Sequence, residues 1–211
     1  MSKISWKGSA LIAPVPCVMV TSGSCEKPNV MTVGWTGITC TKPAKTYISV
    51  RKSRYSYNLI KESGEFAINL TSSALVRAAD FCGVRSGKDV NKFEKCSLTP
   101  ERAEKISVPL IAESPVSLEC RVTDIIELGS HDMFLADIVA VNIRDDLLDE
   151  DGRLALERAD LIAYSHGEYY TLGKRLGKFG YSVEKKSTRA RRARMQKSKE
   201  QNKKATPDDR S

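Results

Sequence analysis

The sequence lacks clustered metal or redox ligands. Its six cysteines form no C-x-x-C pair, and its only two histidines, His131 and His166, lie far from any pair of cysteines. A zinc site or a thioredoxin-type motif is therefore not expected. There is no run of eighteen apolar residues and no charged, apolar leader, so we expect neither a membrane span nor a secretory signal. The cysteines are predicted to be reduced thiols of a cytoplasmic protein.

The sequence also lacks the motifs of several enzyme classes. No G-x-G-x-x-G follows a strand-like run, which argues against a dedicated dinucleotide-binding domain. No Ser-His-Asp arrangement and no pair of catalytic carboxylates is evident. With 41% hydrophobic and 28% charged residues, the 211-residue chain has a globular composition. It is long enough for one substantial core.

The net charge of +8 is distributed unevenly. Residues 184–211 contain eleven lysines and arginines against four acids, which leaves 23 basic and 22 acidic residues, or +1, for residues 1–183. Almost no apolar residue follows position 184. We therefore predict an N-terminal arm at 1–9, one domain at 10–183 and a basic, flexible tail at 184–211. The tail is either a solubilising extension or a segment that binds a polyanion.

Three strand-like runs, at 29–40, 46–58 and 64–71, form the part of the chain around which the rest is organised. Each alternates with a period of two, as expected for strands with one face in a core. The apolar face carries Met31, Val33, Trp35, Ile48, Val50, Phe66, Ile68 and Leu70. The other face is mostly small and hydroxylated with one arginine, and carries Thr32, Gly34, Thr36, Tyr47, Ser49, Arg51, Ser53, Ala67, Asn69 and Thr71. It is either a solvated face or a floor for a flat polar ligand, and the scarcity of lysine and glutamate favours the floor.

The turn after the second run predicts an anion site. We expect Ser56 to be the N-cap of a short helix. A helix N-terminus beside Ser53 and beside Arg51 or Arg54 is suited to a phosphate, although an ordinary capped helix with exposed arginines explains the same residues. The loop 83–93 contains small residues, two lysines and an arginine. It is either a lid over the anion or a solvated loop.

The remaining patterns indicate the fold class. Residues 73–82 have helical spacing, and residues 100–109 are interpreted as a charged connector. Residues 116–143 predict a long antiparallel hairpin whose tip carries His131, either as a turn residue or as a group that binds or protonates an electron-rich ring. Hairpins with inserted helices predict a mainly β fold, an antiparallel barrel.

With these motifs in place, the sequence resembles the flavin reductase-like family with an FMN-binding split barrel, and within it the flavoredoxin group. The resemblance covers nearly all of residues 8–183. Its carriers are N-V-M-T-V-G-W at 29–35, Y-I-S-V-R at 47–51, S-R-Y-S at 53–56, G-E-F-A-I-N-L at 64–70, S-G-K-D-V-N-K-F at 86–93 and G-S-H-D-M-F-L-A-D-I at 129–138. It implies an antiparallel split β-barrel of the FMN-binding type. It also implies a homodimer with FMN between the barrel and the partner subunit.

The resemblance further implies the site residues. The isoalloxazine ring or ribityl chain is expected near Thr32, Ser49 and Asn69, and the phosphate near Arg51, Ser53 and Ser56. Lys92 and Phe93 match the Lys-Phe that closes the family's loop over the cofactor. His131, the predicted catalytic residue, matches a histidine of the flavin or nicotinamide pocket. The full set of predicted cofactor-binding residues is Thr32, Gly34, Thr36, Ser49, Val50, Arg51, Ser53, Ser56, Asn69, Leu70, Lys92 and Phe93.

Three functions follow as hypotheses. The first is an oxidoreductase that binds FMN and passes electrons from NADH, NADPH or another donor to free flavin, an iron complex or a redox protein. The second is an electron-transfer flavoprotein without a nicotinamide site. The third, from another class, is a polyanion-binding module that acts through the tail. The sequence leaves open whether Tyr169 or Tyr170 touches the flavin, and Trp35 is assigned to the core.

Overall fold

The structure is a computed structural model that describes residues 1–184. The chain divides into two compact units, residues 1–172 and residues 173–211. In the second unit, the described residues 173–184 contain a 3₁₀ turn, Tyr181–Val183, and an ion pair between Lys178 and Glu184. The basic tail predicted at 184–211 lies outside the described residues from position 185 onward.

The first unit is built on a seven-stranded antiparallel sheet with the order β3-β2-β6-β9-β10-β5-β4. Its strands are β2 Val18–Gly23, β3 Pro28–Val33, β4 Thr36–Cys40, β5 Lys45–Val50, β6 Glu65–Leu70, β9 Val116–Glu127 and β10 Asp132–Ile143. The β9–β10 pair is the hairpin predicted at 116–143. The predicted mainly β, antiparallel architecture is confirmed.

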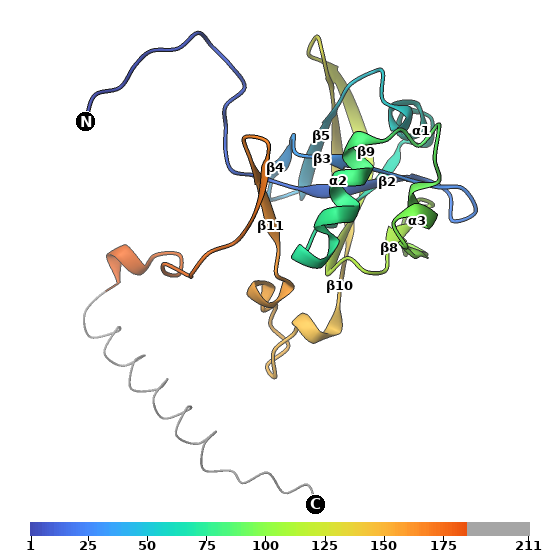
Figure 1. Ribbon diagram of the computed structural model, residues 1–211. Coiled ribbons are helices and arrows are strands. Elements are labelled where there is room, and N and C mark those ends of the chain that lie inside the picture. Colours follow the sequence, from blue (N-terminus) through green and yellow to red (C-terminus); the bar gives the residue numbers. More distant parts are fainter. Residues whose placement is uncertain (185–211) are drawn as a thin grey trace, which may run out of the picture. The chain divides into compact units, whose positions relative to one another are not determined.

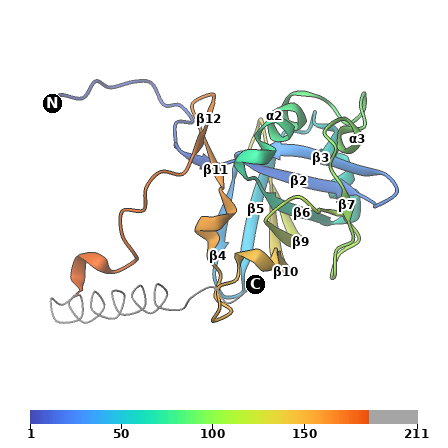
Figure 2. The ribbon, with the colours of Figure 1, turned by 60° about the horizontal axis from the view of Figure 1, so that its bottom comes forward.

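The sheet curls around an inner core. Figures 1 and 2 show the β2–β3 hairpin running across the direction of β5 and β10. On β3 and β5 the predicted alternation is confirmed, because Val33 and Val50 are buried while Thr32 and Ser49 are half-buried. The inner core consists of Val18, Val20, Met31, Val33, Ile48, Val50, Tyr57, Ile60, Phe66, Ile68, Cys120, Phe134 and Ala136.

Helix α1, Tyr55–Ser63, packs into this inner core through Tyr57 and Ile60. The helix ends where Gly64 adopts a positive φ of 67°, which lets the Gly64 N–H donate to the carbonyl oxygen of Ile60. The ring of Tyr57 meets Phe134 edge-on at 5.2 Å between centroids. This helix therefore fixes the turn at 51–54, which precedes it, against the inner core.

The N-cap of α1 differs from the prediction. Arg54 holds the N-cap position, without a side-chain cap, and the helix already includes Ser56. The Ser56 hydroxyl is buried and accepts a hydrogen bond of 2.8 Å from Asn29 Nδ2. The predicted N-cap role of Ser56 is wrong because this side chain ties α1 to β3, not to its own first-turn N–H groups.

Two helices cover the outer face of β2 and β3. Helix α2, Val76–Val84, follows a 3₁₀ turn at Ser73–Leu75, so the predicted helix at 73–82 is confirmed. Helix α3, Lys92–Lys95, was not predicted, and Asn91 caps it by accepting from the N–H of Glu94. The core beneath the helices consists of Cys17, Met19, Val30, Leu75, Ala79, Cys82, Phe93, Leu98, Ile111 and Ile162.

The segment 100–111 covers the outer face of β6. Its short strands β7, Pro100–Glu101, and β8, Leu110–Ile111, pair with each other. Ala67 of β6 packs against Val108 and Leu110. The connector predicted at 100–109 is therefore a cover, and the small face of the third run is buried beneath it.

A separate three-stranded sheet joins β1, Val15–Pro16, to β11, Ile162–Ser165, and β12, Glu168–Thr171. The 3₁₀ turns Asp145–Leu147 and Leu156–Ala159 pack on Val116 at the start of β9. Residues 1–14 precede β1 and are exposed. Within residues 1–184, no helix has the length and apolar character needed to cross a membrane.

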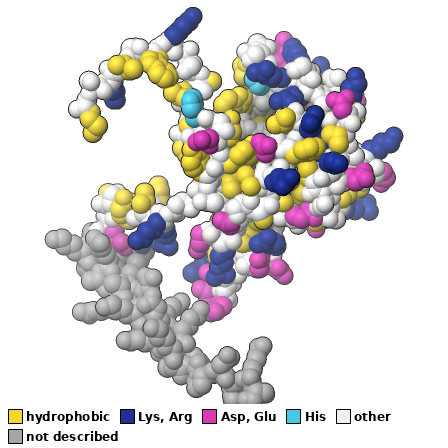
Figure 3. All heavy atoms as spheres, viewed as in Figure 1, with side chains coloured by type: hydrophobic (Ala, Val, Ile, Leu, Met, Phe, Trp, Pro, Cys, Tyr) yellow, Lys and Arg dark blue, Asp and Glu magenta, His cyan; other side chains and the backbone are white. Residues whose placement is uncertain are grey.

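The surface of the first unit carries charges of both signs. Acidic and basic side chains are both spread over the face seen in Figure 3. All six cysteines are free thiols in the structure, and Cys120 is fully buried. Burial raises the pKa of the Cys120 thiol to about 12, so this thiol is protonated and inert at neutral pH.

Candidate functional site

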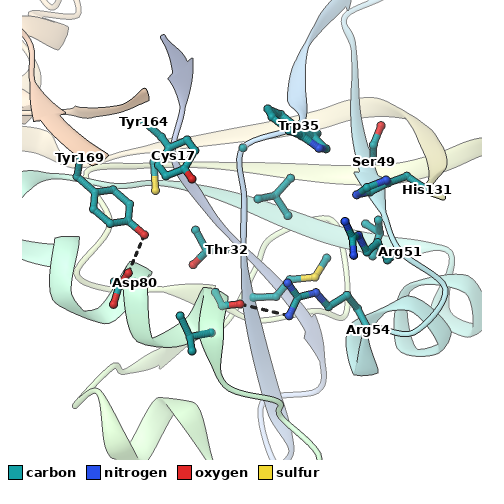
Figure 4. Close-up of a pocket in the computed structure, with 16 residues that line it drawn as sticks. Cys17, Thr32, Trp35, Ser49, Arg51, Arg54, Asp80, His131, Tyr164 and Tyr169 are labelled. Atoms are coloured by element: carbon teal, nitrogen blue, oxygen red, sulfur yellow. Dashed lines mark hydrogen bonds between the residues drawn. The ribbon is translucent and has the colours of Figure 1, made fainter. Parts of the chain in front are cut away.

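A cavity of about 490 Å³, here the seam cavity, lies between the two ends of the curled sheet. Residues 31–35 in and after β3 form part of its lining, and residues 49–51 at the end of β5 form another part. Figure 4 shows Ser49, Arg51 and His131 on one side of the cavity and Asp80, Tyr164 and Tyr169 on the other. The small polar face predicted as a floor is therefore open at β3 and β5.

The first side of the seam cavity combines a histidine with two arginines. His131 lies at the tip of the β9–β10 hairpin, and its Nδ1 is 2.9 Å from the Ser130 hydroxyl. Partial burial, and then the charges of Arg51 and Arg54, lower the pKa of His131 below its ordinary value of 6.5. The imidazole is therefore predominantly neutral at neutral pH. It offers one N–H donor and one acceptor nitrogen.

The second side carries two tyrosines and a carboxylate. Tyr169 of β12 donates a hydrogen bond of 3.0 Å to Asp80 of α2, and its ring lies 5.5 Å from that of Tyr164. Burial, and then the bond to Asp80, raise the pKa of Tyr169. Burial also raises the pKa of Cys17, at the base of this side, to about 11. Tyr169 and Cys17 therefore keep their protons near neutral pH.

Trp35 lies in the lining of the seam cavity rather than in the core. Its side chain is 39% exposed, so the assignment to the core is wrong. The alternation that predicted a buried tryptophan requires a continuous strand, but β3 ends at Val33 and β4 begins at Thr36. Gly34 and Trp35, between the two strands, interrupt the alternation of inward and outward side chains. The indole of Trp35 therefore points away from the core.

A second cavity of about 200 Å³, here the cationic cavity, continues from the seam cavity. The two share six residues: Met31, Thr32, Arg51, Arg54, Gly83 and Val84. Beyond them, the cationic cavity is lined by hydroxyl-bearing and basic residues, among them Ser53, Ser56, Arg85, Ser86 and Lys92. Serine hydroxyls and arginine N–H groups are donors suited to an anion.

The cations of the cationic cavity differ in accessibility. Arg51, Arg54 and Arg85 are exposed, and Arg54 Nη1 donates to the carbonyl oxygen of Gly83 at 3.2 Å. Lys92 is only 4% exposed, and its Nζ donates to the carbonyl oxygens of Val30 and Cys82 at 2.7 and 2.8 Å. Burial lowers the pKa of Lys92. The arginines are thus free to reach a ligand, whereas Lys92 mainly joins β3 to α2.

The structure brings nine predicted site residues to these cavities. Thr32, Gly34, Ser49, Val50, Arg51 and His131 line the seam cavity, and Ser53, Ser56 and Lys92 line the cationic cavity. Four predicted residues lie in neither lining: Thr36, Asn69, Leu70 and Phe93.

Each of these four side chains is occupied elsewhere. The Thr36 hydroxyl donates to the carbonyl oxygen of Tyr47, and Phe93 packs in the core under α2. Leu70 packs against the inner core. Asn69 is fully buried beneath the segment 100–111, where it donates to Met19 and accepts from Ile111 and Ser117. Their predicted contacts with the cofactor stay predictions.

Several lining residues were not predicted. Cys17, Asp80 and Tyr164 come from three separate segments, and no motif in the sequence links them. Arg85 and Ser86 lie in the loop whose basic and small residues suggested a lid over an anion. The composition of that loop was the signal that could have identified them.

Comparison with known proteins identifies relatives of this chain. Residues 11–173 match the family model described as "Flavin reductase like domain". Among solved structures, flavoredoxin of Desulfovibrio vulgaris (Miyazaki F) has a TM-score of 0.80 and 32% identity, over 87% of this chain and 100% of that one. Flavoredoxin from Methanosarcina acetivorans has a TM-score of 0.78 and 27% identity, over the same shares. An NADPH-flavin oxidoreductase of Streptomyces viridifaciens is 28% identical over 145 residues, 67% of this chain and 74% of its own length.

These relatives bear on two predictions. The resemblance to the flavin reductase-like proteins and to their flavoredoxin group is confirmed. The split-barrel fold is confirmed as well, since the curled seven-stranded sheet of this chain superposes on the flavoredoxin structures over nearly their whole length.

Proposed function

Because the chain belongs to the flavin reductase like family, we propose that it is a flavoprotein oxidoreductase that binds FMN in the seam and cationic cavities. The proposed reaction passes electrons from a nicotinamide or another donor to free flavin, an iron complex or a redox partner. We further propose a homodimer in the cytoplasm, with a small molecule or a protein as redox partner.

The observation that carries the proposal is the contrast between the two connected cavities. The seam cavity is wide and is lined largely by aromatic, aliphatic and small polar residues, while the cationic cavity is small. Arg51 and Arg54 lie where the two cavities meet, and Arg85 lines the cationic cavity alone. FMN has the same division, with a broad fused ring at one end and a phosphate at the other. A volume of about 490 Å³ also lies in the range of small-molecule sites, roughly 300–1,000 Å³.

The donor set fits a phosphate. Arg51 and Arg54 would hold it by charge-assisted hydrogen bonds, with the hydroxyls of Ser53 and Ser86 as further donors. Gly83 contributes by its small size, because a Cβ at this position would lie 3.3 Å from Cβ of Thr32. A larger residue there would crowd the passage between the two cavities.

The seam cavity would orient the ring. The small side chains of Thr32 and Ser49 leave room above β3 and β5, and Trp35 supplies an exposed aromatic surface. A bound flavin would supply two-electron transfer, and the protein would supply orientation and hydrogen bonds. The neutral imidazole of His131 would hold or deliver a proton at its ring nitrogens.

The first test is whether the protein holds FMN. We expect the purified protein to be yellow and to release FMN on denaturation. Arg51→Ala should weaken FMN binding by about tenfold or more, because a hydrogen bond to a charged group contributes about 1.5–3 kcal/mol, while riboflavin binding should stay unchanged. Arg77→Ala, an exposed α2 variant outside both cavities, is the control. Equal losses for FMN and riboflavin would contradict a phosphate role for Arg51.

The electron donor distinguishes an enzyme from a carrier. Anaerobic mixing of the FMN-loaded protein with NADH or NADPH should bleach the flavin absorbance if the chain is a reductase. Absence of bleaching with both nucleotides would favour the alternative, an electron-transfer flavoprotein without a nicotinamide site.

The charge of the tail favours a second function in polyanion binding. Its eleven cations would contact several phosphates with a steep dependence on salt. Deletion of residues 185–211 should abolish salt-dependent binding to a polyanion and leave the FMN content unchanged. Loss of FMN on deletion would contradict the assignment of the cofactor to residues 10–183.

A further inference from the structure

The segment that follows β12 carries large apolar side chains on its surface. Leu176 and Val183 are 94% and 83% exposed, and Phe179 is fully exposed. The segment folds on itself only locally, because a Cβ on Gly177 would lie 2.7 Å from Cδ1 of the Tyr181 ring. This local turn leaves the three apolar side chains in contact with water. Apolar side chains gathered on a surface in this way indicate a site of interaction.

The apolar residues of this segment have the spacing of one helical face. They follow one another at intervals of four, three and four residues: Leu172, Leu176, Phe179 and Val183. A helix over residues 172–183 would place all four in a single narrow stripe. In the structure, the described residues 173–184 contain a 3₁₀ turn and no α-helix. The three glycines of the segment disfavour a helix in water, so a helix here requires a surface that the stripe can bury itself in.

Basic residues surround the apolar stripe. On the same helix, Lys174, Arg175 and Lys178 would lie outside the stripe, on its flank and on the opposite side. Lys174 and Arg175 are exposed, whereas Lys178 is paired with Glu184 at 3.2 Å. Six of the ten residues at 185–194 are lysine or arginine, and none is acidic. The stripe is therefore followed directly by a concentrated positive charge.

This combination favours an anionic lipid surface as the partner. A nucleic acid would attract the cations, but it offers no apolar phase for leucine and valine side chains. A bilayer with anionic headgroups offers both an apolar phase and a negative surface potential. Residues 1–184 contain no helix that is long and apolar enough to cross a membrane, so the contact would be made along the surface.

We propose that residues 172–183 form an amphipathic helix on an anionic membrane surface. The apolar stripe enters the boundary between headgroups and acyl chains, and Lys174, Arg175 and the cations at 185–194 meet the headgroups. One short stripe supported by charge gives reversible binding. The proposal goes beyond the proposed function and does not depend on FMN.

The first test measures co-sedimentation of the full-length protein with lipid vesicles. We expect binding to vesicles of equimolar phosphatidylcholine and phosphatidylglycerol, and at least tenfold weaker binding to phosphatidylcholine alone. Leu176→Ser combined with Phe179→Ser should weaken binding to the mixed vesicles at least tenfold, because it removes apolar area from the stripe. The FMN content and the affinity for a DNA duplex should stay unchanged. Ile38→Ser, at an exposed apolar position on β4, is the matched control.

The second test reverses charge beside the stripe. Lys174→Glu combined with Arg175→Glu should weaken binding to the mixed vesicles about tenfold, because two attractive charges become repulsive at the headgroups. The matched control is Lys61→Glu combined with Lys95→Glu, since both lysines are exposed and lie outside the segment. Equal binding by the charge-reversed variant and the wild type would contradict the role of these cations.

The outcomes separate the lipid surface from other partners. Absence of binding to the mixed vesicles, or binding that the Leu176→Ser and Phe179→Ser variant retains in full, would overturn the proposal. In the second case, the tail would bind polyanions by charge alone. If the same variant changed the oligomeric state measured by light scattering but not the vesicle binding, the stripe would be a contact between copies of the chain and the proposal would fail. Wild-type protein that binds vesicles but no FMN would contradict the proposed function and support this inference.

Discussion

The outer face of the sheet carries small polar residues in two regions, and the two regions are used differently. On β3 and β5, Thr32 and Ser49 are half-buried and line the seam cavity. On β6 and β9, Asn69 and Glu119 have the same outward facing but are fully buried beneath the segment 100–111. Polarity at these positions therefore does not mark a ligand site by itself. What covers the strand decides the role.

In the covered region, the polar side chains of the strands form hydrogen bonds with the segment 100–111. Asn69 Oδ1 accepts from the N–H of Ile111 at 3.0 Å, and the Thr21 hydroxyl donates to the carbonyl oxygen of Pro109. Glu119 accepts from the N–H groups of Glu104 and Lys105 at 2.9 and 2.6 Å. These bonds satisfy a segment that has little regular structure of its own. In the open region the Thr32 hydroxyl donates to the carbonyl oxygen of Ala79, and both Thr32 and Ser49 line the seam cavity.

The largest effect should separate the two regions by stability. Asn69→Ala should lower the free energy of unfolding by about 4 kcal/mol, because it leaves several buried partners without a hydrogen bond at roughly 1–3 kcal/mol each. Ser49→Ala, in the open region, should change it by less than about 0.5 kcal/mol. Denaturant unfolding of both variants measures the contrast. Similar losses for the two variants would remove the distinction between covered and open positions.

The contrast between the regions also shows how far sequence reasoning reaches. Period-two alternation is a local signal, and it correctly gave the two faces of β3 and β5 and with them Thr32, Ser49 and Arg51. The cover over Asn69 depends on contacts such as that between Ile111 and Asn69, which are 42 residues apart. The segment 100–111 has no periodicity that would predict where it packs. A polar residue on the outer face therefore could not be assigned to a core or a site from sequence alone.

The same limit applies to the walls of the seam cavity. Tyr169 and Asp80 are 89 residues apart and meet because β12 and α2 pack near one another. Trp35 escaped prediction for a different reason, since the strand break between β3 and β4 reverses the alternation. Residues of the basic loop at 83–93 line the cationic cavity, and its role over an anion stays a prediction, made from its composition alone. A group of functional side chains within one segment can be predicted from the sequence, whereas a group that the fold assembles from several segments cannot.

The second prediction concerns the covered region and the pH dependence of the stability that Glu119 contributes. Burial alone would raise the pKa of Glu119, but hydrogen bonds from the N–H of Glu104, from Asn142 and from the N–H of Lys105 lower it below its ordinary value of 4.5. The carboxylate therefore stabilises the folded state above the unfolded pKa, and this contribution is lost as the pH falls through the folded pKa.

Glu119→Gln should lower the free energy of unfolding at pH 7 by about 2–3 kcal/mol, since the amide cannot accept all these bonds. The difference from wild type should shrink as the pH falls from about 4.5 through the lower pKa of the folded state, where the wild-type carboxylate also becomes protonated. Denaturant curves across this range check it, with exposed Glu94→Gln as the control. A constant difference at all pH values would exclude ionised Glu119 as the source of the stability.

The third prediction turns to the open region. A Cβ on Gly87 would lie 2.0 Å from Asn29 Oδ1. Asn29 cannot withdraw, because its Nδ2 donates to both Ser22 and Ser56 at 2.8 Å. Gly87→Ala should therefore displace the 86–88 loop, lower the free energy of unfolding by about 1–2 kcal/mol and weaken FMN binding.

The control for the loop variant is Gly8→Ala, since a Cβ on Gly8 meets no atom within 4 Å. It should leave both stability and FMN affinity unchanged. If Gly87→Ala lowered the free energy of unfolding but left the FMN affinity unchanged, the 86–88 loop would contribute to stability and not to FMN binding. Ser86 of this loop would then not be a donor to the phosphate.

The smallest expected effect is a change in the pKa of His131 when the negatively charged FMN binds beside the open region. The pKa of His131 is held low by partial burial and then by the positive charges of Arg51 and Arg54. Bound FMN brings a negative phosphate to these arginines and should raise the His131 pKa. Arg51→Ala should raise it in the flavin-free protein by removing one of the two repelling charges.

An NMR titration of the His131 ring with and without FMN measures both changes, and Arg77→Ala serves as a control that leaves the local charge unaltered. Asn69→Ala adds a second control from the covered region, because its side chain faces a different cover and should not alter the His131 titration. A His131 pKa that stays the same when FMN binds would mean that the phosphate does not reach the arginines. The open region would then bind FMN without electrostatic coupling between the phosphate and His131.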